Sequence, residues 1–131
     1  MKVYVDAKIL NMHDKTLPHE AFVGYVVDEG GQSNAKRVEA DESDDAEILA
    51  VLFAVEELGK GGGPLTVVCD HESVVSEAKR ADVKSPSPLL QELRRVLREN
   101  PGVELVALLA NPAHKVVTDF VNSVKGATEV G

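Results

Sequence analysis

The hydrophobic and polar positions of the first forty residues follow the alternation of β-strands. Residues 1–10 predict a strand, and residues 20–29 predict a second one in which Gly24 marks a bulge or a close backbone approach. After a Gly-Gly turn, a more polar third strand is expected at about 32–40. Strands that follow one another through turns predict an antiparallel meander.

The pattern changes to helical spacing at about residue 43. Ser43 is the predicted N-cap and Gly59 the predicted stop of this helix. Its expected inward stripe consists of Ala46, Leu49, Ala50, Phe53 and Leu58. The continuous apolar run at 65–69 then predicts a short strand buried on both faces.

Three helices and one strand are expected in the remaining chain. A helix of two to three turns is predicted at 71–81, and an amphipathic helix with outward arginines at 89–99. An apolar strand follows at 103–109, and Asn111-Pro112 begins the last helix.

The predicted order of elements is therefore β-β-β-α-β-α-α-β-α. Strands separated by helices imply parallel crossovers, so the expected fold is α/β, with a five-stranded mixed sheet flanked by helices. The first strand is expected at its centre. A length of 131 residues suits one domain, here residues 1–131.

Composition narrows the class of protein. Hydrophobic residues make up 44% and charged residues 27% of the chain, which is typical of a soluble globular protein without membrane segments. The single cysteine, Cys69, excludes an internal disulfide and fits a reducing cytoplasmic location. A net charge of −8 argues against broad nonspecific binding to nucleic acid, but not against a site in which metal ions offset acidic residues.

Four acidic residues lie where apolar elements end or are interrupted: Asp6, Glu47, Asp70 and Asp119. A carboxylate in such a place is costly unless it is solvated, paired or bound to a cation. Ligands bind at the carboxyl ends of parallel strands, where Asp70 is expected. Both helices that carry Glu47 and Asp119 can pack across the sheet beside the first strand, so the four acids are expected to share a site.

As ligands, carboxylate oxygens favour Mg²⁺ or Mn²⁺ over Zn²⁺. Two such ions about 4 Å apart stabilise the attacking and the leaving oxygen of an in-line phosphodiester displacement. The acidic residues therefore predict metal-dependent hydrolysis of a phosphodiester.

The segments VYVDAK, GYVV, SDDAEILAVLFAVEEL, VVCDHESVV and HKVVTDFVN, in this order, resemble ribonuclease H of type 1 and the wider ribonuclease-H-like superfamily. The resemblance covers essentially the whole chain. It implies the ribonuclease-H-like fold, two Mg²⁺ or Mn²⁺ ions as cofactor, and RNA–DNA hybrid as the nucleic-acid partner. It also implies that the metal ligands are Asp6, Glu47, Asp70 and Asp119, and that His114 represents the mobile catalytic histidine of the last loop.

The sequence departs from the family's pattern around these acids. Ala7 stands where the family has a glycine that lets nucleic acid approach the backbone. Asp44 and Asp45 replace paired asparagines that resemble contacts to RNA 2′-hydroxyls, and His71 replaces the usual serine. The added negative charge would repel a phosphate backbone unless a cation intervenes.

Each residue also has an interpretation that involves no metal. Asp6 would be an exposed edge-strand residue, Glu47 would favour the helix dipole, and Asp70 would be an N-cap. Asp119 would pair with Lys115 one helical turn away, and His114 and His71 would be surface histidines. The basic clusters of Lys79, Arg80 and Lys84, or Arg94, Arg95 and Arg98, either hold a phosphate backbone or form solvated faces.

Three functions remain open at this stage. The first is an endonuclease that cleaves the RNA strand of RNA–DNA hybrids. The second is a module that keeps the fold and binds nucleic acid or protein without cleavage. The third is a nuclease that acts on DNA junctions or ends, because the acids report the chemistry while surface shape reads the substrate.

Overall fold

The computed structural model describes residues 1–10, 20–28, 32–40, 42–59, 63–79, 87–108, 113, 115 and 117–119, with the backbone alone for Leu10 and Ser43. The strands are β1 (Lys2–Leu10), β2 (Glu20–Val27), β3 (Ser33–Val38), β4 (Leu65–Cys69) and β5 (Val103–Ala107). The helices are α1 (Ser43–Leu58), α2 (Glu72–Lys79) and α3 (Pro88–Glu99). Residues 113, 115 and 117–119 are also helical.

The strands form one five-stranded sheet in the order β3-β2-β1-β4-β5, with β1 at its centre. β1 pairs with β2 and β2 with β3 in antiparallel fashion, whereas β4 is parallel to both β1 and β5. The predicted meander, the parallel crossovers and the central position of the first strand are therefore confirmed.

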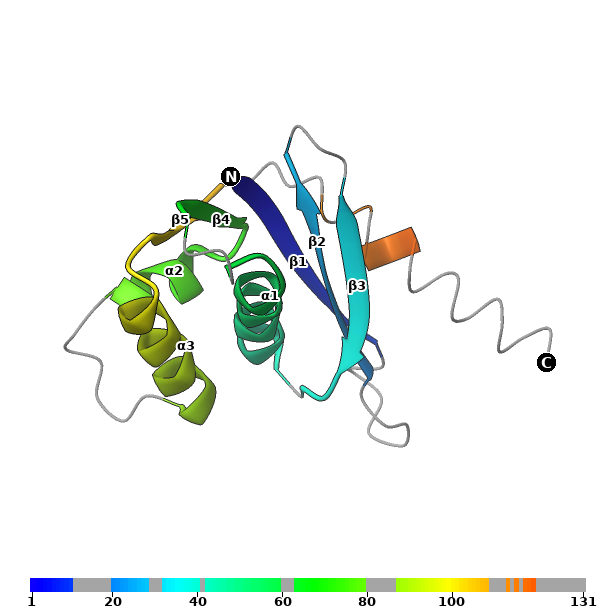
Figure 1. The fold of residues 1–131 in the computed structure, drawn as a ribbon. Helices are drawn as coiled ribbons and strands as arrows, with labels where there is room; N and C mark the ends of the chain where they lie inside the picture. Colours follow the sequence, from blue (N-terminus) through cyan, green and yellow to red (C-terminus); the bar gives the residue numbers. More distant parts are fainter. Residues whose placement is uncertain are drawn as a thin grey trace.

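The two faces of the sheet are covered differently. α1, α2 and α3 lie on one face, and the short helical segment at 117–119, drawn in orange, lies on the other (Figure 1). On the face of the three helices, alternate residues such as Val3, Val5 and Val23 belong to the main hydrophobic core. On the opposite face, Phe22 and Val117 are buried outside that core.

Gly24 is the site of the predicted close approach. It points to the same face as Phe22, and a Cβ atom added to it would lie 2.8 Å from Cγ2 of Val117 and 3.2 Å from the carbonyl oxygen of Asn34. Gly24 is the partner of Asp6 in the β1–β2 ladder. The glycine therefore lets the segment with Val117 pack beside the strand that carries Asp6.

α1 differs from its prediction in two respects. The N-cap is Glu42 rather than Ser43, with extended dihedral angles (φ −123°, ψ 148°) and no side-chain hydrogen bond. Asp44 and Asp45 in the first turn instead provide the negative charge that favours a helix N-terminus. The buried set is also wider than one stripe, since α1 contacts both the sheet and α3, and comprises Ala46, Glu47, Ile48, Ala50, Val51, Phe53, Ala54 and Val55.

α3 begins as a capped amphipathic helix, one residue before its predicted start. The Ser87 hydroxyl accepts a hydrogen bond from the Leu90 amide (3.2 Å), and Pro88 occupies the first turn. Leu90 and Leu93 are buried as predicted, and Leu97 is half-buried.

The arginines of α3 differ from one another. Arg94 was expected to point outward, but it is half-buried and donates from Nε and Nη2 to the carbonyl oxygen of Glu77 (3.3 and 2.7 Å). It joins α3 to α2 because the inward-facing turn of α3 brings its guanidinium against the end of α2. Arg95 is exposed and pairs with Glu92 and Glu99 of its own helix.

Some predictions fall outside the described residues. These are the Gly30-Gly31 turn and the start of the last helix at Asn111-Pro112. Among the helices that are described, none is both long and apolar enough to cross a membrane.

Candidate metal centre

The candidate site lies where β1 and β4 separate. β1 pairs with β2 from Val3 to Leu10, but it pairs with β4 only through Lys2, Val3 and Tyr4. Asp6 follows on β1 just beyond this short ladder, and Asp70 comes directly after β4 ends. The two carboxylates therefore lie on either side of the place where β1 and β4 separate, and this place is called the notch below.

Glu47 reaches this notch from the second turn of α1. Glu47 is 2% exposed, and Asp6 is 3% exposed. The two carboxyl groups are hydrogen-bonded to each other, and the Ala7 amide donates a further hydrogen bond to Glu47. A hydrogen bond between two carboxyl groups requires a proton on one of them. The metal-free site therefore holds a proton in place of one negative charge.

The environment raises the pKa of Glu47 to about 9. Burial is the largest cause, followed by the negative charges of Asp70 and then Asp6. At neutral pH the metal-free Glu47 carboxyl is accordingly neutral. Binding of a divalent cation would offset the same three causes and release this proton.

Two oxygens of the site have no hydrogen-bond partner among the described residues: Oε2 of Glu47 and Oδ1 of Asp70. Both atoms are buried, and Glu47 as a whole residue is almost fully buried. A buried acceptor without a donor costs about 1–3 kcal/mol. Hard oxygen ligands of this kind fit Mg²⁺ or Mn²⁺, so the residues present suit the cation that their sequence pattern predicted.

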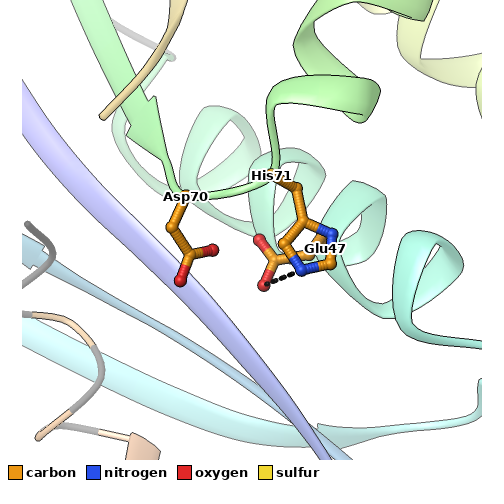
Figure 2. Close-up of side chains that lie close together, drawn as sticks. All are labelled: Glu47, Asp70 and His71. Atoms are coloured by element: carbon orange, nitrogen blue, oxygen red, sulfur yellow. Dashed lines mark ion pairs between the residues drawn. The ribbon is translucent and has the colours of Figure 1, made fainter. Parts of the chain in front are cut away.

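His71 completes the cluster. Figure 2 shows Glu47 from α1 beside Asp70 and His71, which follow the end of β4. The His71 Nδ1 atom lies 3.4 Å from Oδ1 of Asp44, and Nε2 lies 4.0 Å from Oε1 of Glu47. One potential ligand atom each from Glu47, Asp70 and His71 lie within 4.8 Å of one another.

The backbone at His71 is held by its neighbours. Its carbonyl oxygen accepts hydrogen bonds from Sγ of Cys69 (3.6 Å) and from the Val75 amide (3.3 Å). Burial raises the pKa of the Cys69 thiol to about 11, so it remains a protonated donor at neutral pH. Cys69 is thus the buried strand cysteine that its sequence context predicted, and it positions the residue after Asp70.

The structure brings together three of the four predicted acids. Asp6 is buried in the central strand, which excludes the interpretation of an exposed edge residue. Asp119 is exposed and lies two residues after Val117, which packs against Gly24, the ladder partner of Asp6; its place among the metal ligands stays a prediction. His114 lies outside the described residues.

His71 is a neighbour of the acids to which the sequence pattern assigned no role. The sequence suggested that His71 either replaces the family's serine or is a surface histidine. Its position immediately after the strand-end Asp70 is the feature that could have indicated a place beside the acids. That position brings its imidazole beside Glu47. Asp44, which was noted only for its negative charge, faces this histidine.

The fold is ribonuclease-H-like. No protein-family model and no curated protein matches the sequence. Among solved structures, the chain is similar to ribonuclease H1 from the halophilic archaeon Halobacterium salinarum, at 20% identity and a TM-score of 0.61 over 88% of this chain and 89% of that one.

Two further structures share the fold. LC11-RNase H1 in complex with an RNA/DNA hybrid has 21% identity and a TM-score of 0.62 over 82% of this chain and 83% of that one. The PFV RNase H domain has 19% identity and a TM-score of 0.64 over 82% of this chain and 77% of that one. At these identities the likeness establishes the fold, and the chemistry has to be argued from the site itself.

Proposed function

We propose that this protein is a divalent-metal-dependent nuclease that cleaves the RNA strand of RNA–DNA hybrids. The observation that carries the proposal is the buried carboxyl group of Glu47, held against Asp6 and Asp70 with unpaired oxygens facing the notch. Such an arrangement is unfavourable without a cation and suited to one. Fold similarity to ribonuclease H1 structures, one of them bound to an RNA/DNA hybrid, supports nucleic acid as the substrate.

Asp6, Glu47 and Asp70 would hold the cations, and Asp119 would join them as a further ligand as the family resemblance implies. When bound, two Mg²⁺ or Mn²⁺ ions would supply an activated water and stabilise the leaving 3′ oxygen. Glu47 would give up its proton when cations are bound, and the Ala7 amide, which donates a hydrogen bond to Glu47, would keep the carboxylate oriented. His114 is the proposed proton carrier near the end of the chain.

The test is cleavage of a labelled RNA–DNA hybrid in the presence of Mn²⁺ or Mg²⁺. The wild type is expected to cut the RNA strand, and the Asp70→Asn variant to lose cleavage. Glu72→Gln is the matched control, because Glu72 is an exposed acid two residues after Asp70 that does not belong to the cluster of Glu47, Asp70 and His71. Cleavage no faster than that of Asp70→Asn would refute the proposal.

A second candidate is a binding module that retains the fold without cleavage. Two observations favour it: Asp119 is exposed, and Asp44 adds negative charge beside His71. This candidate predicts nucleic-acid or partner binding with no turnover in either metal. Turnover that disappears in Asp70→Asn would rule it out.

Duplex DNA, single-stranded DNA and a four-way DNA junction belong in the same panel of substrates. The acids would serve hydrolysis of any of these phosphodiesters equally well. Preference for the hybrid would indicate that the enzyme recognises the 2′-hydroxyl groups of the RNA strand. Preference for a junction or a DNA end would replace the hybrid proposal while retaining the metal-dependent chemistry.

A further inference from the structure

His71 faces the carboxylate site from the side of the helices, and its imidazole is held between two acids. Nδ1 lies 3.4 Å from Oδ1 of Asp44. Nε2 lies 4.0 Å from Oε1 of Glu47, the ion pair drawn as a dashed line in Figure 2. The two ring nitrogens therefore point to different partners. One points to the exposed carboxylate of Asp44 and the other to the buried one of Glu47.

This geometry resembles the arrangement in which a histidine ligand is oriented by a second carboxylate. Metal-ligating histidines usually donate their other ring N–H to a carboxylate, which fixes the tautomer and turns the free nitrogen toward the metal. With its proton on Nδ1, His71 donates toward Asp44 and presents the Nε2 lone pair to the notch.

The spacing suits a single cation. Ligand bonds of roughly 2.0–2.2 Å place two ligands of one ion no more than roughly 4.4 Å apart. The potential ligand atoms of Glu47, Asp70 and His71 lie within 4.8 Å of one another, so small side-chain rotations bring all three into range. Oε2 of Glu47 is buried and lacks a donor among the described residues, which independently indicates a ligand at this point.

We propose that His71 is a nitrogen ligand of this site, and that this ligand gives the site a preference for ions such as Co²⁺ and Zn²⁺ over Mg²⁺. Imidazole binds such ions well, whereas Mg²⁺ strongly prefers oxygen ligands. Asp44 is the positioning residue of His71. The inference rests on the cation site of the proposed function and does not depend on cleavage.

The test measures metal binding in the absence of nucleic acid. Titration with Co²⁺, followed by its visible absorption, is compared with Mg²⁺ binding followed by calorimetry. His71→Ser is expected to weaken Co²⁺ binding at least about tenfold, the lower end of what loss of even an outer partner of a metal ligand costs. Mg²⁺ binding is expected to be unchanged, and Glu72→Gln is expected to leave both affinities as in the wild type.

A spectroscopic measurement separates ligation from a structural role. Electron spin-echo envelope modulation of bound Mn²⁺ is expected to show coupling to an imidazole ¹⁴N in the wild type and in Glu72→Gln. The coupling is expected to vanish in both His71→Ser and His71→Asn, whose folding is checked by circular dichroism. In Asp44→Asn the coupling is expected to persist, with weaker Co²⁺ binding because the imidazole is no longer held in place.

Three outcomes overturn the inference: equal Co²⁺ affinity in wild type and His71→Ser, no nitrogen coupling in the wild type, or no binding of any of these cations. Failure of the proposed function looks different. In that case the nitrogen coupling and the Co²⁺ preference persist, while no nucleic acid is cleaved. Conversely, the wild type could cleave the hybrid while wild type and His71→Ser bind metal ions equally well. That result would support the proposed nuclease function and refute the proposal that His71 is a nitrogen ligand.

Discussion

The notch beside β1 and the outer surface of α3 both contain clusters of ionisable side chains. The two clusters differ in burial and in whether opposite charges compensate one another. On α3, Arg95 lies between Glu92 and Glu99, and these exposed charges compensate one another within a single helix. In the notch, Asp6, Glu47 and Asp70 are all acids, two of them are buried, and burial with mutual repulsion keeps Glu47 protonated. The charges of the surface cluster compensate one another without a ligand. The buried cluster retains a proton as long as no cation is bound.

The comparison teaches which charges bear on function. Exposed ion pairs contribute little to stability because water and salt screen them. Buried acids without a cationic partner are costly, so their presence indicates a ligand. A nitrogen base does lie beside one of these buried acids, since Nε2 of His71 is 4.0 Å from Oε1 of Glu47.

The largest expected effect is on catalysis. Asp6→Asn keeps the shape of the side chain but removes a proposed ligand, so hybrid cleavage is expected to fall at least about a hundredfold, equivalent to about 2.7 kcal/mol. Arg95→Ala is expected to cleave like the wild type. Single-turnover rates of the three proteins on one labelled hybrid measure this difference, and equal rates for Asp6→Asn and wild type would contradict it.

The next effect is stabilisation by a cation. Because the ion binds the folded site and not the unfolded chain, a concentration of a hundred times Kd is expected to stabilise the protein by about 2.7 kcal/mol. This appears as a rise in Tm of several degrees when Mn²⁺ is added. Glu47→Gln is expected to lose most of the rise, and NaCl at matched ionic strength serves as the control for screening.

The pH dependence of stability provides the third prediction. The pKa of Glu47 is about 9 in the fold against an ordinary value of 4.5, so the folded protein keeps a proton that the unfolded chain releases. Metal-free stability is therefore expected to fall as the pH rises between these values, by up to about 1.4 kcal/mol per pH unit. Glu47→Gln lacks this dependence.

Urea denaturation of wild type and Glu47→Gln at several pH values measures the difference directly. The advantage of the variant is expected to grow from acidic toward alkaline pH. A constant difference across the range would mean that Glu47 ionises in the fold as it does in the unfolded chain.

The smallest effect separates two adjacent arginines. Arg94→Ala removes the hydrogen bonds to the Glu77 carbonyl that join α3 to α2, and is expected to cost about 1 kcal/mol. Arg95→Ala breaks exposed ion pairs only, and no measurable change in Tm is expected. Thermal unfolding of the two variants side by side provides the test, and equal Tm values would remove the distinction between them.

The order of the elements could be predicted from the sequence because periodicity and turn residues are local signals. The alternation in β1 and the apolar run of β4 each identified a strand and its exposure, as the sheet confirms. The burial of α1 was underestimated, since contact with both the sheet and α3 is a property of packing that one stripe does not reveal. Its N-cap was misplaced because Ser43 is a common capping residue, while the backbone places Glu42 there.

For the candidate site, the sequence indicated which acids to compare but not how they meet. Asp6, Glu47 and Asp70 converge because the β1–β4 ladder stops early, and the length of a ladder is not encoded in any single motif. The proximity of His71 to Glu47 depends on the same separation of strands. The predicted roles of Asp119 and His114 remain predictions.

The early end of the β1–β4 ladder also has a consequence for the order of folding. β1, β2 and β3 are consecutive in the chain, so their pairing closes short loops, whereas Glu47 and Asp70 join Asp6 only after β4 has crossed over. We expect the repulsion among the acids to arise late, after the meander has formed. A cation would then act mainly on the unfolding rate, and so lengthen the lifetime of the folded protein more than it speeds folding.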